Sequence, residues 1–169
     1  MKHTLRIEHT WDGQPLTPSE VVVLRYHIAE SGFLKIEIDA PFHGDPAPST
    51  NAGSCWGLWE YEVVELFLVD ENGHYLELEF GPHGHYLALQ LDAPRSVLHS
   101  QMSLIHNAKM SESRWQSQSI IPKDLLPTRI VKHNAFAIHG RGQERRYLTH
   151  SPLPGPKADF HQPHRFPDC

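Results

Sequence analysis

The sequence has little of what would place it in several large functional classes. It has only two cysteines, Cys55 and Cys169, far apart in the chain, so no disulfide framework is indicated and a reducing compartment is the simpler interpretation. Its 15 basic and 20 acidic side chains give a net charge of −5, which lacks the basic footprint of general nucleic-acid binding. No apolar run approaches membrane-spanning length, and the opening residues, MKHTLRIEHTWDG, lack the apolar centre of a signal peptide. We therefore expect a soluble, cytoplasmic protein that binds neither nucleic acid nor a membrane.

Motifs of the common enzyme classes are also missing. No nucleophile elbow, P-loop or metalloprotease motif occurs, and Gly140-Arg141-Gly142 is too short for a dinucleotide fingerprint, which needs a strand before it and a helix after it. Residues 122–127 (PKDLLP) are the one stretch that predicts a helical turn. At 169 residues and 39% hydrophobic, without repeats or a linker, the chain is expected to form one domain, 1–169, with its own core.

The most informative stretch is residues 56–91. Three short apolar runs, 63–69, 75–80 and 86–91, are rich in β-forming residues and bounded by Gly, Asn, Asp or Pro, which predicts an antiparallel meander. A three-residue loop, 71–73, with Gly73 left-handed closes the first hairpin. Because side chains alternate with a period of two, one face then carries Val64, Leu66, Leu68, Leu76, Leu78 and Phe80. A four-residue loop over 82–85 would add Leu87, Leu89 and Leu91 to that face.

The opposite face of the meander carries polar and aromatic groups. It is predicted to present Glu65, Phe67, Tyr75, Glu77, Glu79, Tyr86 and Gln90, with Trp59 just upstream. Three carboxylates among aromatic rings and an amide do not make a second hydrophobic core. The face could be a platform on which a polyhydroxylated ligand stacks, a cation site, or a solvated sheet surface with ordinary cross-strand pairs.

The rest of the chain predicts more strands and irregular connections. Further strands are expected over residues 4–8, 21–28, 33–39, 103–110, 114–121, 134–139 and 145–149. Residues 40–54 form a long proline-containing loop, a kind of segment that is commonly functional, and the proline-rich tail carries Phe160 and Phe166, which we expect to pack against the body. Nine or ten strands with almost no helix predict an all-β fold, an antiparallel β-sandwich of jelly-roll-like type.

Two further chemistries are open at this point. Glu65, Glu77 and Glu79 could supply the acid and base of a glycosidase, although nothing else in the sequence marks a cleft that excludes water. Two histidine pairs, His83 with His85 and His161 with His164, could bind zinc or copper. Neither pair has the spacing of a closed structural zinc site. Surface histidines are the alternative.

Several segments together resemble a known family. The matching stretches are residues 7–13 (IEHTWDG), 39–42 (DAPF), 59–68 (WEYEVVELFL), 75–84 (YLELEFGPHG), 136–140 (FAIHG) and 159–161 (DFH). They are similar to a family of small bacterial and animal proteins that includes a vertebrate chromosome 4 open-reading-frame product. That family belongs with the family 9 carbohydrate-binding modules and the DOMON-like sandwiches. The resemblance covers nearly the whole chain and implies a jelly-roll-like sandwich and sugar binding.

The resemblance also implies a site. In the family 9 modules a tryptophan and a glutamate six residues later form part of the sugar site, and Trp59 and Glu65 match that spacing. An indole stacks on the apolar face of a pyranose while a carboxylate accepts hydrogen bonds from its hydroxyls. The modules close the site with a second aromatic slab, and the corresponding position here is His150, after Arg146. Structural calcium occurs in some modules, but the sequence does not place its ligands.

We therefore predict a non-enzymatic domain that binds a small carbohydrate or polyol on the face around Trp59 and the three glutamates. Arg146 and His150 would contribute from the C-terminal side, and no cofactor other than structural calcium is expected. The rival hypothesis is an interaction scaffold that keeps the fold without the sugar. In that case Trp56 and Trp59 would contact a protein partner or a second subunit.

Overall fold

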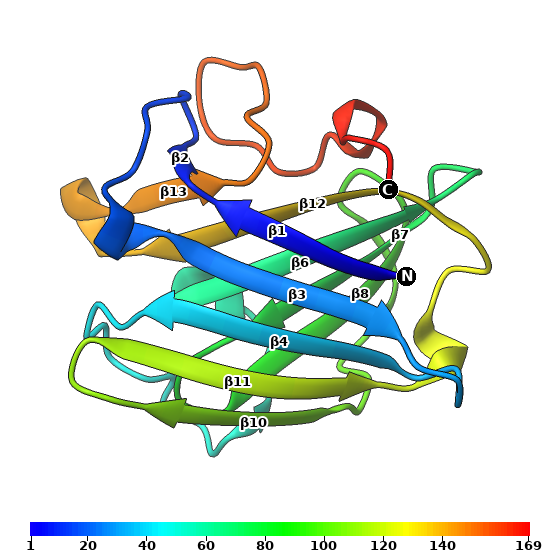
Figure 1. Cartoon of the computed structure of the whole chain (residues 1–169), viewed down its shortest axis with the longest axis horizontal. Helices are drawn as coiled ribbons and strands as arrows, with labels where there is room; N and C mark the ends of the chain where they lie inside the picture. Colours follow the sequence, from blue (N-terminus) through cyan, green and yellow to red (C-terminus); the bar gives the residue numbers. More distant parts are fainter.

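The computed structural model describes all 169 residues and consists of two β-sheets packed face to face (Figure 1). The first sheet has five strands, and each neighbouring pair is antiparallel. In spatial order they are β1 (Lys2–Ile7), β3 (Val22–Ile28), β4 (Leu34–Pro41), β11 (Arg114–Ile121) and β10 (Ile105–Met110). This sheet lies toward the viewer in Figure 1.

The second sheet has eight strands, and its centre is the predicted meander. Its order is β2 (His9–Thr10), β13 (Arg146–Thr149), β12 (Ile130–His139), β6 (Val63–Asp70), β7 (Tyr75–Phe80), β8 (His85–Ala93) and β5 (Gly53–Ser54), with β9 (Ser96–Ser100) also paired to β8. All pairs are antiparallel except β5 with β8. The predicted antiparallel β-sandwich is confirmed.

Helix is confined to five single 3-10 turns. They are η1 (Pro18–Glu20), η2 (Leu58–Glu60), η3 (Lys123–Leu125), η4 (Gly142–Glu144) and η5 (Pro163–Arg165). Only η3 was predicted, because the other four are too short to produce a period of 3.6 residues in the sequence. None of these helical segments has the length and apolarity that crossing a membrane requires.

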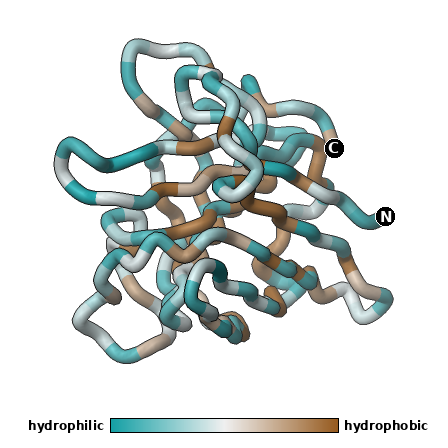
Figure 2. The backbone as a smooth tube through the Cα atoms, turned by 60° about the vertical axis from the view of Figure 1, so that its left-hand side comes forward, coloured by the Kyte–Doolittle hydropathy of each residue, from teal (hydrophilic) through white to brown (hydrophobic).

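The main core lies between the two sheets. The alternation in β4 sends Leu34, Ile36 and Ile38 inward, where they meet the apolar face of the β6–β7 hairpin. That hairpin has the predicted register, with Leu66 opposite Leu78, and the backbone N–H of Asp70 donates to the carbonyl of His74 across a three-residue loop. In Figure 2 the hydrophobic stretches of the tube gather in the central strands and the outer loops are mostly hydrophilic.

The loop of the second hairpin is one residue shorter than predicted. Each side chain of β8 therefore points to the opposite face of the sheet from the one expected. Gly81 pairs with His85, so the loop is Pro82 to Gly84 rather than four residues, and Gly84 takes a left-handed conformation with φ of 85°. Phe80 is therefore opposite Tyr86. As a result Tyr86 and Gln90 face the inter-sheet core, while Leu87, Leu89 and Leu91 lie on the face that carries the glutamates. The expectation that Tyr86 and Gln90 share the glutamate face is wrong.

The glutamate face is itself covered by a second hydrophobic cluster, contrary to prediction. Phe67, Phe136 and the leucines of β8 pack there against the C-terminal tail, which runs along the top of the molecule in Figure 1 (orange to red). Phe160 stacks on Phe136 with ring centroids 4.0 Å apart, and Phe166 is buried against Phe67. The eight-stranded sheet is thus buried on both faces over its centre.

Candidate functional site

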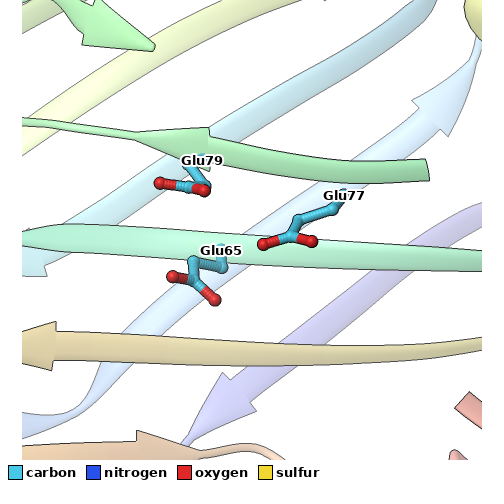
Figure 3. Close-up of side chains that lie close together, drawn as sticks. All are labelled: Glu65, Glu77 and Glu79. Atoms are coloured by element: carbon cyan, nitrogen blue, oxygen red, sulfur yellow. The ribbon is translucent and has the colours of Figure 1, made fainter. Parts of the chain in front are cut away.

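The three glutamates meet inside this second cluster. The register of β6 and β7 sets Glu65 directly opposite Glu79, and Glu77 is two residues away on the same face. One carboxyl oxygen of each residue lies within 4.8 Å of the others, and Figure 3 shows the three side chains gathered over β6 and β7. None of the three is more than 4% exposed. We call Glu65, Glu77 and Glu79 the glutamate cluster.

The cluster is poorly supplied with hydrogen-bond partners. Both carboxyl oxygens of Glu79 and Oε2 of Glu77 are buried without any partner. The nearest basic group is the His161 ring, whose Nδ1 lies 4.0 Å from Glu77 Oε2, but this nitrogen is already hydrogen bonded to the Tyr75 hydroxyl at 2.7 Å. Buried carboxyl groups without partners are rare because their desolvation is not compensated.

Burial and mutual repulsion make these side chains weak acids. Burial raises the pKa of Glu77 to about 8. It also raises the pKa of Glu65 and of Glu79 well above the ordinary value, and the neighbouring carboxyl groups add to the effect, while the Arg145 guanidinium partly opposes it at Glu65. At neutral pH the cluster therefore retains protons in the absence of a cation.

A pocket of about 400 Å³ opens directly above two members of the cluster, Glu65 and Glu77. Its floor comes from β6 and β7, and its walls come from the segment around η2, from β8, the following turn and β9, from β12 and β13, and from the tail. The lining side chains are Trp56, Trp59, Glu65, Phe67, Glu77, Leu89, Leu91, Arg95, Val97, Ile138, Tyr147, Ala158, Asp159, Phe160 and His161. The pocket thus has an apolar and aromatic wall and an acidic floor.

The two tryptophans form one side of the pocket. Their rings meet edge to face, with centroids 5.2 Å apart and an interplanar angle of 80°. Arg145 holds the Trp59 segment in place, because its guanidinium donates to the carbonyl oxygens of Trp59, Glu60 and Gly140. The same guanidinium lies over the ring of Tyr147 at 5.7 Å, so one side chain fixes both aromatic walls.

The tail and the β8–β9 turn close the other side. Arg95 Nη2 and Asp159 Oδ1 form an ion pair at 2.8 Å across the rim, and the backbone N–H of Arg95 donates to the Tyr75 hydroxyl. This hydroxyl also bonds His161. The polar groups of the rim are therefore held in a connected network rather than left free to rotate.

Of the predicted site residues, Trp59, Glu65 and Glu77 line the pocket. Glu79 lies beneath it in the cluster, and Tyr75 supports its rim through the hydroxyl. Tyr86 and Gln90 are on the other side of the sheet, where the Tyr86 hydroxyl accepts from the backbone of Leu104 and Gln90 donates to the carbonyl of Leu125.

Arg146 and His150 also lie away from the pocket, contrary to prediction. The Arg146 guanidinium donates to Glu20, and His150 Nδ1 is 2.8 Å from the carbonyl oxygen of Arg6. Alternation along β13 explains this placement: Arg146 lies on the same side of the strand as the core residue Leu148, whereas Tyr147 faces the pocket. The C-terminal aromatic wall is therefore Tyr147 rather than His150.

Sequence reasoning missed the contributions of Arg95, Asp159 and Phe160. Asp159 and Phe160 stand in one of the stretches that carry the family resemblance, which was the available signal, whereas Arg95 had none. In the histidine pair of 83–85, both Nε2 atoms lie within hydrogen-bond distance of carbonyl oxygens, those of Asp45 and Thr50. The only group of three or more metal-capable side chains that converge is the glutamate cluster.

Comparisons with known proteins identify relatives that align with this chain over most of the length of both proteins. No protein-family model matches it. It is 39% identical to UPF0462 protein C4orf33 of Homo sapiens over 165 residues, which covers 92% of this chain and 82% of the human protein. It is 37% identical to the C4orf33 homologue of Danio rerio over 171 residues, covering 96% of this chain and 86% of that protein.

A solved structure supports the fold independently. A crystal structure of a candidate carbohydrate-binding protein from Bacteroides uniformis matches with a TM-score of 0.72, covering 97% of this chain and 84% of that one, at 15% sequence identity. At this identity the likeness concerns the fold. The level and extent of identity to the vertebrate relatives show that the chain belongs to the UPF0462 (C4orf33) family.

Proposed function

We propose that the pocket binds a small carbohydrate or a related polyol and does not catalyse a reaction on it. The observation that carries this proposal is the pairing of an aromatic wall, Trp56, Trp59 and Tyr147, with the carboxyl groups of Glu65 and Glu77 on the floor. The C–H face of a pyranose packs on an aromatic ring, and its hydroxyls need hydrogen-bond partners at the edge. At about 400 Å³ the pocket is within the usual range for small-molecule sites.

The state of the carboxyl groups suits a hydroxyl-rich ligand. In the protein without a bound cation, the Glu77 side chain, with its pKa raised to about 8, is protonated at neutral pH and can donate as well as accept a hydrogen bond. A sugar hydroxyl also does both. The Arg95–Asp159 pair at the rim adds a donor and an acceptor that are already fixed in position, which lowers the entropy lost on binding.

The arrangement of the glutamates favours binding over hydrolysis. A glycosidase needs two carboxyl groups that flank the scissile bond. Here Glu65 and Glu77 lie side by side on the pocket floor, on adjacent strands of one sheet (Figure 3). The remaining carboxyl group of the lining, Asp159, is paired with Arg95 and is not free to act as the second catalytic group. The fold shared with the Bacteroides uniformis protein is consistent with a binding role.

The proposal is tested by a thermal-shift screen against hexoses, pentoses, their disaccharides and acyclic polyols. A ligand at about a hundred times its dissociation constant stabilises by roughly 2.7 kcal/mol, which is a shift of several degrees for a chain of this size. Trp59→Ala should abolish the shift. The matched control is Phe33→Ala, which removes an aromatic ring that is 40% exposed and outside the pocket. A sugar-induced shift that survives in Trp59→Ala would contradict the proposal.

One observation favours a second candidate function, a protein-interaction surface. Trp56 is 54% exposed and Val97 on β9 is 39% exposed, and both line the pocket, so its mouth has an apolar rim that a partner could cover. This alternative predicts concentration-dependent self-association or no response to any sugar. Sedimentation of the wild type and of Trp56→Ala distinguishes it from the binding pocket.

A further inference from the structure

The protein supplies no basic side chain that pairs with the three carboxyl groups of the glutamate cluster. No lysine or arginine lies within salt-bridge distance of any of the three carboxyl groups. Arg145, the basic residue that most affects Glu65, has its guanidinium committed to three backbone carbonyl oxygens. The strand register nevertheless holds the three acids together in the centre of a hydrophobic cluster.

Protonation does not resolve the difficulty at Glu79. This residue is fully buried, and neither of its oxygens has a partner. A neutral carboxyl group still has a proton to donate and lone pairs to satisfy, so it too would be left unpaired. The buried oxygens of Glu79, beside Glu65 and Glu77, therefore point to a partner from outside the chain.

The spacing of the oxygens fits a metal ion. Two oxygens that bind one Ca²⁺ at 2.3–2.6 Å are at most about 5 Å apart, and one oxygen from each glutamate lies within 4.8 Å of the others. Carboxylate oxygen is the donor that Ca²⁺, Mg²⁺ and Mn²⁺ prefer. Zn²⁺, which prefers thiolate and imidazole ligands, is less well matched, because the nearby His161 Nδ1 is hydrogen bonded to the Tyr75 hydroxyl.

We propose that Glu65, Glu77 and Glu79 together bind one divalent cation of the oxygen-preferring class. Glu79 is the deepest ligand, and Glu65 and Glu77 reach the cation from the floor of the pocket, which also provides its route of entry. The coordination positions that the protein leaves open face the pocket. There, hydroxyl groups of a sugar would complete the shell, a step that rests on the proposed function.

The cation site is tested first without any sugar. The protein is treated with EDTA, desalted and titrated with Ca²⁺, Mn²⁺ and Mg²⁺ by calorimetry, and Tb³⁺ luminescence excited through the nearby tryptophans gives a second readout. We expect one ion per chain for at least one of the three metals. Glu79→Gln and Glu77→Gln should weaken it by about tenfold or more, the loss typical of damage to a metal site, while Glu112→Gln, on an exposed turn, should bind as the wild type does.

Circular dichroism and melting temperature show that each variant is folded, so a loss of binding cannot be a loss of structure. The proposal is overturned if the EDTA-treated wild type binds none of the three metals saturably, or if Glu77→Gln and Glu79→Gln both bind like the wild type. Sugar titrations with and without EDTA then separate the two proposals. Metal binding without any effect on sugar affinity would overturn only the coordination of sugar by the cation.

Discussion

The clearest single test of the second hydrophobic cluster is Phe160→Ala. The Phe160 ring is stacked on Phe136 with an interplanar angle of 9° and also contacts Trp11 and Tyr147, with ring centroids 5.7 and 6.1 Å away. It is 9% exposed. Removing a buried phenylalanine side chain costs about 3–5 kcal/mol through lost transfer energy and the cavity left behind. Because Phe160 lies at the edge of the cluster, we expect about 3 kcal/mol.

For a chain of this length a loss of 3 kcal/mol lowers the melting temperature by roughly 6–12 °C. Urea unfolding gives the free energy, and limited proteolysis reports whether the tail has been released from the sheet. Phe33→Ala is the control, since this ring is 40% exposed and its loss should change stability by about 0.5 kcal/mol or less. A loss below about 1 kcal/mol in Phe160→Ala would refute the description of the tail as a packed wall of the pocket.

Two further predictions concern pH and the backbone. Burial lowers the pKa of His133 to about 4, so between pH 6.5 and 4 the unfolded chain binds the proton and the folded one does not. The stability of the wild type relative to His133→Gln should therefore fall by about 1.4 kcal/mol for each pH unit below 6.5, and parallel stability curves of the two proteins would disprove this. Gly140 has φ of +80°, and an added Cβ would lie 2.3 Å from the carbonyl oxygen of Glu144. Gly140→Ala should cost at least about 2 kcal/mol in chemical unfolding, more than Gly13→Ala, where φ is +86° but nothing lies within 4 Å; equal costs would contradict the close approach.

The parts of the fold that the sequence predicts are those set by local pattern. Clean alternation identifies β4, and a Gly at the end of a three-residue loop fixes the β6–β7 register. The β7–β8 loop was harder, because β8 has apolar residues on both faces of the strand, so hydrophobicity does not select between a loop of three and one of four residues. The length of that loop decided whether Leu89 joined the core or the site.

In the candidate site, too, the residues that a local motif marks were predictable and the long-range contacts were not. Trp59 and Glu65 were predicted from the family resemblance and the register of the meander. Tyr147 was missed because the resemblance placed the C-terminal aromatic wall at His150, three residues further along the chain. The cover over the glutamate face comes from the tail, nearly a hundred residues after Glu65 in the sequence. No periodicity encodes that contact, since the proline-rich tail has neither helix nor strand pattern. The burial of the glutamate cluster could therefore not be predicted from the strands alone.

The most direct test of the proposed function is a calorimetric titration of the best sugar from the screen into the wild type and into Trp59→Ala. The proposal predicts saturable binding of one sugar per wild-type chain and none in Trp59→Ala, although both proteins melt cooperatively. Absence of binding by every sugar in the screen, or equal affinity in the two proteins, would contradict it.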